Sequence, residues 1–352
     1  MQRRSFLAGV GVSAVAGPMK AAPEREDGTI RSRAAAPPRK VIVGTVMQDL
    51  WGKNPGLQPR LDQLTGLVDR LAADARKKYG RGPDIAALPE TAITGEAKDA
   101  LAAAVPLAGP VQEAFARKAR EHRCYIVAPT YLREPEGKQV SNAAILFARD
   151  GSVAGIYRKV HLVVGADGES TEGGSSLGKE VPVFDCDFGK VGMQICYDME
   201  FDTGWKELAR QGCELVIWPT QSPQTATPAF RAMRQGYYIV SSTWRSNATI
   251  FEPTGRIAAQ IRPPEGILTY ELDLSYAILP WTGPLDNGRA MRKKFGDKVG
   301  FHYYEEEDRG IFWSNDPNMS IGQMIRSMGL EEQQEQLARV RKVYRRAGLR
   351  DL

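Results

Sequence analysis

Three reactive side chains of different types follow strand-like segments of this sequence. Glu90 lies in ALPETAITG, Lys159 in IYRKVHL and Cys196 in GMQICYDMEF. The loops at strand ends are where α/β folds usually build their sites. A cysteine attacks as the thiolate, so its pKa of about 8.5 must be lowered by a cation, or a base must take its proton. Lys159 can supply the positive charge, and Glu90 can accept the proton.

Each of these residues also has an ordinary structural explanation. Taken alone, Glu90 could be a surface carboxylate, Lys159 a solvated strand residue and Cys196 an inert core thiol. The chain also contains a second candidate base. His161, one of only three histidines, lies two residues after Lys159 and would share its face of a continuous strand. A Cys–His pair is therefore the alternative to a Glu–Lys–Cys set.

Strand and helix signals alternate around these residues. Apolar residues recur at helical spacing between 57 and 75, and Asp150-Gly151 is typical of a hairpin turn. The predicted strands are 40–47, 84–88, 124–131, 142–148, 153–162, 181–188, 190–198, 214–220, 238–244 and 267–274, with a hairpin in ATIFEPTGRIAAQI; the predicted helices are 57–79, 110–122, 205–212 and 228–236. Helices must cover the sheet faces, and two sheets must cover each other. We therefore predict an α/β (α+β layered) fold, a four-layer α-β-β-α sandwich.

Several motifs together resemble the nitrilase superfamily of carbon–nitrogen hydrolases. They are Pro89-Glu90, Asn142 with its hairpin, Tyr157-Arg158-Lys159-x-His161-Leu162, Asp185 to Gly192 and Cys196-Tyr197-Asp198, within a resemblance from about Lys40 to about Leu274. The resemblance implies a sandwich fold of the nitrilase type and the catalytic residues Glu90, Lys159 and Cys196. It also implies hydrolysis of a non-peptide C–N bond, an amide or an N-carbamoyl group, through a cysteine thioester. No metal or organic cofactor is implied.

The resemblance implies two supporting groups as well. A second glutamate is expected between the lysine and the cysteine, a few residues before a Pro-Gly turn. Glu172 fits best, although Leu177 stands where the family has proline, and Glu169 is the alternative. The backbone N–H of Tyr197, the residue after the nucleophile, would stabilise the oxyanion together with Lys159.

The substrate does not follow from the resemblance. After Cys196-Tyr197-Asp198 the family often has Arg and then Phe-Pro-Glu, whereas this chain has MEFDT. A small-molecule amide, carbamoyl or nitrile substrate is expected, and a nitrilase that converts a nitrile to a carboxylic acid is the alternative enzyme. From a different class, the chain could be a catalytically inactive binding or scaffold subunit.

The two ends of the chain predict export and assembly. Residues 1–22 begin with Arg3-Arg4-Ser5-Phe6-Leu7 and resemble a twin-arginine signal peptide, which implies a periplasmic protein, or a cytoplasmic one if this interpretation is wrong. Residues 23–38 are expected to be a linker, 39–275 the hydrolase domain, and 276–352 a C-terminal extension, an aromatic-rich loop followed by a helix at 330–347. The extension must pack on the core or on a partner subunit, because exposed aromatic patches are uncommon. A homodimer or higher homo-oligomer is expected.

Charge and hydropathy exclude other partners. The net charge is +5, of which Arg3, Arg4 and Lys20 contribute three, so the remainder is 5 − 3 = +2. That is too weak to predict a nucleic-acid partner. No internal apolar run approaches the roughly 20 residues of a membrane span, so no stable span is expected after signal removal. With one of the four cysteines kept free, at most one disulfide could form.

Overall fold

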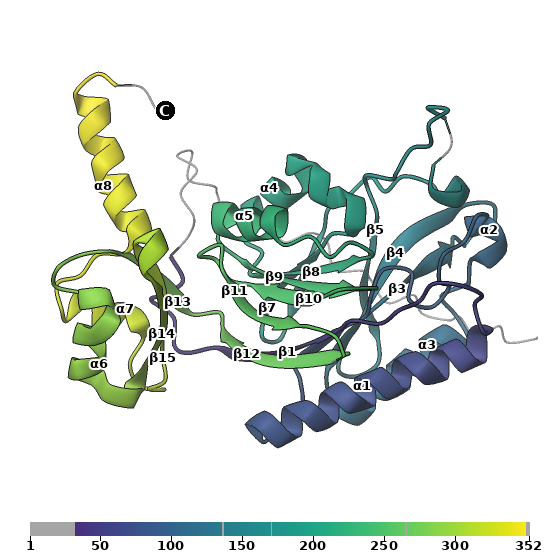
Figure 1. Ribbon diagram of the computed structural model, residues 1–352, viewed down its shortest axis with the longest axis horizontal. Coiled ribbons are helices and arrows are strands. Elements are labelled where there is room, and N and C mark those ends of the chain that lie inside the picture. Colours follow the sequence, from purple (N-terminus) through teal and green to yellow (C-terminus); the bar gives the residue numbers. More distant parts are fainter. Residues whose placement is uncertain (1–31, 136, 170, 265, 350–352) are drawn as a thin grey trace, which may run out of the picture.

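The computed structural model describes residues 32–135, 137–169, 171–264 and 266–349. The predicted export signal (1–22) and residues 23–31 of the predicted linker lie outside these ranges. Figure 1 shows a layered body with a smaller region at one end, from which one helix projects. Among the described residues, no helix is long and apolar enough to cross a membrane.

Two six-stranded sheets form the inner layers of the body. The first has the order β12-β1-β2-β3-β4-β5, and the second β11-β10-β9-β8-β7-β6. Three neighbouring strands are parallel in each sheet, β1-β2-β3 and β7-β8-β9, and the outer strands are antiparallel. The first sheet contains β1 (Lys40–Val46), β2 (Ile85–Ala87), β3 (Tyr125–Arg133), β4 (Val140–Phe147), β5 (Val153–Arg158) and β12 (Ile267–Asp273). The second contains β6 (Val183–Cys186), β7 (Gly189–Met193), β8 (Leu215–Thr220), β9 (Tyr238–Thr243), β10 (Ala248–Phe251) and β11 (Ile257–Ile261).

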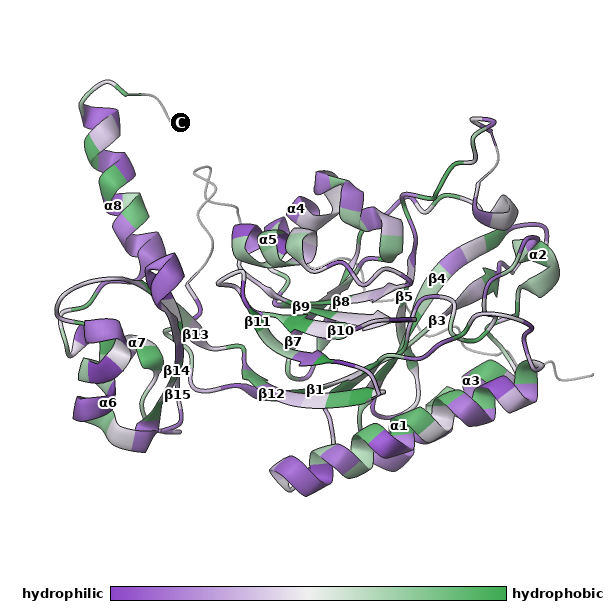
Figure 2. Cartoon of the chain, viewed as in Figure 1, coloured by the Kyte–Doolittle hydropathy of each residue, from purple (hydrophilic) through white to green (hydrophobic). Residues whose placement is uncertain are grey.

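Helices cover the outer face of each sheet (Figure 1). α1 (Leu57–Tyr79) and α3 (Pro110–His122) pack on the first sheet, and α4 (Asp202–Arg210) and α5 (Ala226–Gln235) on the second. α1 buries its leucine and valine face and ends at Gly80, whose left-handed conformation closes the helix. Figure 2 shows hydrophilic residues on the outer turns of α1. The predicted four-layer α-β-β-α sandwich is confirmed.

The facing sides of the two sheets form one apolar core. Its members come from both sheets and include Val43, Ile85, Val127, Met193, Ile217 and Val240. Because both faces of each sheet are covered, β8 and β9 are buried along their whole length and β1 is buried after Lys40. This packing fixes the ends of β2, β5 and β7 relative to one another.

The region after β12 is a small folded unit, so the prediction of a loop there was wrong. A three-stranded sheet has the order β13-β15-β14. Its elements are β13 (Tyr276–Pro280), α6 (Arg289–Phe295), β14 (Val299–Tyr304), β15 (Arg309–Ser314) and α7 (Ile321–Arg326). Phe301 and Phe312 stack on each other inside a separate apolar cluster. The predicted terminal helix is present as α8 (Gln333–Arg346), none of whose residues is buried.

Residues 32–38 lie between this unit and the sandwich. Arg33 donates to the carbonyl of Cys213 and forms an ion pair with Glu214. Ala34 is buried, and its carbonyl accepts from the N–H of Gly322 in α7. This described end of the predicted linker therefore packs on both parts of the protein. All four cysteines are free thiols.

Candidate active site

The site lies where three strands end. Glu90 lies in the turn after β2, Lys159 directly follows β5, and Cys196 lies shortly after β7. β2 and β5 belong to the first sheet and β7 to the second, so the site spans both inner layers. The strands predicted over 153–162 and 190–198 end earlier, at Arg158 and Met193.

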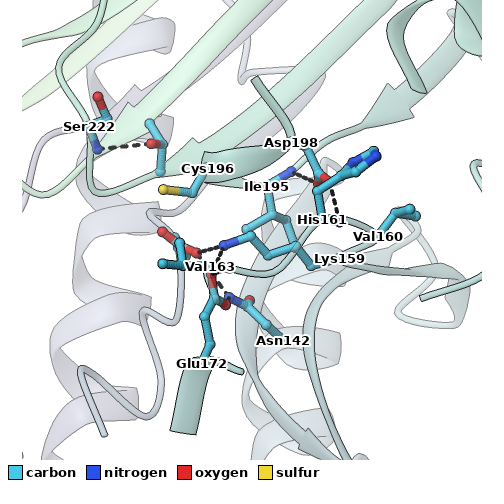
Figure 3. A network of polar contacts seen from close by, with 12 residues as sticks. Asn142, Lys159, Val160, His161, Val163, Glu172, Ile195, Cys196, Asp198 and Ser222 are labelled. Carbon is cyan, nitrogen blue, oxygen red and sulfur yellow. Dashed lines mark hydrogen bonds and ion pairs between the residues drawn. The ribbon is translucent and has the colours of Figure 1, made fainter. Parts of the chain in front are cut away.

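Lys159 is the centre of a buried polar network (Figure 3). Its Nζ lies 3.0 Å from Glu90 Oε1 and also contacts Glu172 Oε1. Asn142 Nδ2 donates to Glu90 Oε1 at 2.9 Å and to Glu172 Oε2 at 3.1 Å. Burial alone would lower the pKa of Lys159, but Glu90, Cys196 and Glu172 raise it well above its ordinary value. Lys159 therefore remains an ammonium group.

Glu90 has one carboxylate oxygen in the network and one outside it. Oε1 accepts from Lys159 and Asn142, whereas the buried Oε2 has no hydrogen-bond partner among the described residues. The indole N–H of Trp244 donates to the Glu90 carbonyl at 2.7 Å and fixes the backbone. A buried acceptor without a donor is uncommon and marks a group that is available for chemistry.

Cys196 occupies a strained elbow. It begins the short helix η2 (Cys196–Glu200) with a φ of 42°, the left-handed region that a side chain disfavours. The residue as a whole is partly exposed. Burial and the charge of Glu90 raise the pKa of the Cys196 thiol to about 12 and outweigh the opposing effect of Lys159. A raised pKa favours the protonated thiol, which would need a base in order to attack as a thiolate.

Comparison with known proteins decides the family. The family described as carbon-nitrogen hydrolase matches residues 53–279, well over half of the chain. This chain belongs to the carbon–nitrogen hydrolase family. Human omega-amidase NIT2 is 27% identical over 230 residues, 59% of this chain and 83% of the human protein. Omega-amidase NIT2-A of Xenopus laevis is 28% identical over 190 residues, 48% of this chain and 68% of that protein.

A solved structure agrees with the fold. Nit3 of Saccharomyces cerevisiae, a member of branch 10 of the nitrilase superfamily, has a TM-score of 0.58 and 23% sequence identity. The similarity covers 67% of this hydrolase and 90% of the yeast chain. The family match thus confirms the carbon–nitrogen hydrolase family that the motifs indicated, and this structure supports the fold.

Of the candidate second glutamates, the hydrolase brings Glu172 to Lys159. Glu172 also accepts from the N–H of Val163 at 3.1 Å, whereas Glu169 is exposed. The following segment passes directly over the lysine, because Gly178 N–H donates to the Lys159 carbonyl at 2.8 Å. A Cβ at Gly178 would lie 2.1 Å from a backbone oxygen, so only glycine permits this approach.

His161 does not take part in the lysine network. Its Nδ1 lies 2.9 Å from Asp198, and its ring stacks on Phe201 with a centroid distance of 4.1 Å. In Figure 3 the imidazole lies on the far side of Asp198 from Cys196. The argument that His161 shares a face with Lys159 was wrong, because β5 ends at Arg158 and the chain then turns.

Sequence reasoning missed three residues of this hydrolase site. Asn142 bridges the two glutamates, Trp244 fixes the Glu90 backbone, and Asp198 joins two segments beside Cys196. Asn142 and Asp198 both lie within the motifs that suggested the family, so they could have been singled out. Trp244 lies 154 residues from Glu90 and carried no such signal. The Tyr197 side chain is exposed and edge-on to Phe201, and its backbone directly follows Cys196.

One group of side chains outside the site has the spacing of metal ligands. Among the described residues these are Asp69 in α1 and Glu121 and His122 in α3, of which His122 is buried. Lys118 Nζ already lies 2.7 Å from Asp69 and 2.9 Å from Glu121. The acidic charges are therefore balanced by an ammonium group, and the cluster is explained as a helix–helix ion-pair network.

Proposed function

We propose that this protein hydrolyses a small non-peptide amide or N-carbamoyl compound through a thioester on Cys196. The observation that supports this most directly is that Cys196 lies beside the buried Glu90 and Lys159, and that Glu90 Oε2 has no hydrogen-bond partner among the described residues. The Lys159 ammonium lies beside the Glu90 carboxylate, with Nζ 3.0 Å from Oε1. The omega-amidase names of the relatives support an amide as the substrate.

In the first half of the reaction, Glu90 Oε2 takes the thiol proton as the Cys196 sulfur attacks the carbonyl carbon. The carbonyl oxygen becomes an oxyanion, which the Lys159 ammonium and the Tyr197 backbone N–H stabilise. When the tetrahedral adduct collapses, the C–N bond breaks and Glu90 returns its proton to the departing nitrogen. Ammonia or an amine leaves, and the acyl group remains as a thioester.

In the second half, a water molecule replaces the departed amine. Glu90 takes one proton from the water molecule while the water oxygen attacks the thioester carbon. The C–S bond then breaks, Glu90 protonates the leaving sulfur, and a carboxylic acid is released. Glu172 and Asn142 keep Lys159 and Glu90 in place throughout both halves.

A substrate screen tests this proposal. Purified protein is incubated with aliphatic amides, N-carbamoyl amino acids and nitriles, and released ammonia is measured together with the acid product. We expect release from amides or carbamoyl compounds, and none from the Cys196→Ser variant. Release only from nitriles would make the protein a nitrilase instead. Absence of turnover, with no labelling of Cys196 by thiol-directed electrophiles, would favour the inactive scaffold subunit.

We also propose that the protein is exported to the periplasm in folded form. The support is the Arg3-Arg4 motif with its following apolar stretch. A reporter fused behind residues 1–30 should be exported, and replacing both arginines with lysine should block export. Continued export of that variant by the pathway for unfolded chains would contradict the twin-arginine assignment.

The protein is further proposed to form at least a homodimer, with the C-terminal region in the contact. α8 supports this, because a helix of 14 residues is only marginally stable when isolated in water and its Val343 and Tyr344 are 55% and 51% exposed. Trp281 is 58% exposed as well. Deleting 333–352 removes α8 but keeps the three-stranded sheet, so the molar mass by light scattering should fall. A full-length protein that is monomeric at micromolar concentration would contradict assembly.

A further inference from the structure

Asp198 lies two residues after the nucleophile, and its side chain is fully buried. It accepts four hydrogen bonds, and Figure 3 shows Ile195 and His161 beside it. Oδ2 accepts from the Ile195 N–H at 2.9 Å and from the Tyr157 hydroxyl at 2.7 Å. Oδ1 accepts from the backbone N–H and from Nδ1 of His161, each at 2.9 Å. Each of the two carboxylate oxygens therefore accepts two hydrogen bonds.

The four donors come from the two segments that carry the reactive groups. Tyr157 and His161 lie two residues before and two residues after Lys159, beside the end of the first sheet. Ile195 immediately precedes Cys196, beside the end of β7 in the second sheet. A single carboxylate thus connects the backbone of the lysine segment to the backbone of the nucleophile segment.

The elbow at Cys196 requires such support. A residue with a side chain persists at a φ of 42° only when its surroundings determine the conformation. The backbone N–H of Asp198 donates to the Ile195 carbonyl at 3.0 Å, and the Trp205 indole donates to the Asp198 carbonyl at 2.9 Å. Asp198 is consequently fixed at its backbone as well as at its side chain.

We infer that Asp198 is a positioning residue, which fixes the Cys196 sulfur relative to the Glu90 carboxylate and the Lys159 ammonium. The inference rests on the proposed function, because it assigns Asp198 a part in bringing the thiol to its base. Asp198 itself touches neither substrate nor reacting atoms.

An asparagine at this position cannot make the same contacts. Each carboxylate oxygen accepts from one backbone N–H, that of Ile195 or that of His161, and a backbone N–H can only donate. In either orientation, the asparagine NH₂ would face one of these two donors. Asp198→Asn therefore removes the hydrogen bond between the side chain and the backbone of one of the two segments, and it hardly changes the volume of the side chain.

The experiment compares wild type and Asp198→Asn by the pH dependence of Cys196 alkylation with iodoacetamide, followed by mass spectrometry. Since the pKa of Cys196 is raised to about 12, reactivity at neutral pH depends on Glu90 taking the proton. We expect alkylation at pH 7 to fall about ten- to a hundredfold in the variant, as for loss of a charge-assisted hydrogen bond. The remaining rate should rise steadily with alkaline pH. With a hydrolysed amide, kcat should fall similarly while KM changes little.

Glu252→Gln is the matched control. Glu252 is also buried, and it accepts from Thr254 at 2.6 Å and from His302 at 3.1 Å, in the turn between β10 and β11. Its replacement should lower the melting temperature and leave the alkylation profile unchanged. If Asp198→Asn behaves in this way, with a lower melting temperature but the wild-type profile and kcat, Asp198 is only structural and the inference is overturned.

If Asp198→Asn does not fold, a second variant is tested in its place. Tyr157→Phe combined with His161→Asn removes both side-chain contacts and leaves the two backbone donors. Alkylation at pH 7 should then fall about tenfold, and an unchanged rate would overturn the inference. Alkylation needs no substrate, so it distinguishes the two proposals. A wild type that hydrolyses no amide contradicts the proposed function, whereas equal alkylation profiles contradict the role of Asp198.

Discussion

Cys196 lies between two buried networks that are both built on carboxylates but differ in how the charge is balanced. On one side, Glu90 and Glu172 share the Lys159 ammonium. On the other, the Asp198 carboxylate accepts hydrogen bonds from two backbone N–H groups, a hydroxyl and an imidazole. The lysine network leaves Glu90 Oε2 without a partner among the described residues, whereas both oxygens of Asp198 are engaged.

This difference suggests a chemical role for the lysine network and a positioning role for the Asp198 network. A buried acceptor that has no donor in the resting protein can receive one during a reaction, and in the proposed mechanism Glu90 Oε2 takes the thiol proton and later a water proton. A carboxylate whose contacts are all made gains nothing from a further donor and serves to join the segments that it contacts. Substitutions in the lysine network should therefore reduce turnover more than substitutions in the Asp198 network.

The largest effect on turnover is expected from replacing the sulfur of Cys196, which lies between the two networks. Cys196→Ser should lower kcat/KM by at least about a thousandfold, because a serine hydroxyl is far harder for a carboxylate to ionise than a thiol. Circular dichroism and the melting temperature should stay near wild type. Cys186→Ser is the control, since Cys186 is a partly exposed free thiol in β6. Residual activity above a few per cent would exclude Cys196 as the attacking group.

Glu90→Gln should follow, with a loss of about a hundred- to ten-thousandfold, the usual contribution of a general base. The amide oxygen can keep the Lys159 contact, while the NH₂ group replaces the unpaired Oε2 and cannot accept a proton. Both acylation and hydrolysis of the thioester should slow. Stopped-flow measurement of the two steps checks this, and a variant that loses only one of them would show that a second group serves as base in the other.

Glu172→Gln should have a smaller effect, about ten- to a hundredfold in kcat/KM, because it weakens one charged contact to Lys159 and leaves Glu90 in place. Glu169→Gln is the matched control, three residues away and exposed, and should behave as wild type. Steady-state kinetics of both variants suffice. Equal losses at the two positions would mean that the contact between Glu172 and Lys159 does not matter for turnover.

The sequence predicted the elements of the sandwich well because their signals are local. Helical spacing of apolar residues marked α1, and the Asp150-Gly151 turn marked the hairpin of β4 and β5. The grouping of Glu90, Lys159 and Cys196 came from motifs, and the structure brings these residues together. The contacts of Trp244 and Asp198 depend on how segments 154 and 37 residues apart meet, and local patterns do not contain that information.

The C-terminal region was predicted poorly for the same physical reason. Its strands are five or six residues long, and β13 pairs with β15 although 28 residues of chain separate the two strands (309 − 280 − 1). Polar and aromatic residues alternate irregularly there, so neither the helical period nor the strand period stands out in the sequence. Only α8, which has a regular pattern and makes few contacts, was predicted correctly.

The smallest effect is expected at His161, and it tests the comparison most directly. His161→Asn removes the imidazole from Asp198 but leaves the His161 backbone N–H in its contact with Oδ1, so one neutral or singly charged hydrogen bond is weakened. Such a bond is worth about 1 kcal/mol, which corresponds to a loss of about tenfold or less in kcat/KM. His302→Asn, at the Glu252 contact, is the control and should leave kcat/KM unchanged. If His161→Asn proved more damaging than Glu90→Gln, a Cys–His mechanism would replace the glutamate base, and the network around Asp198 would be the one that performs the chemistry.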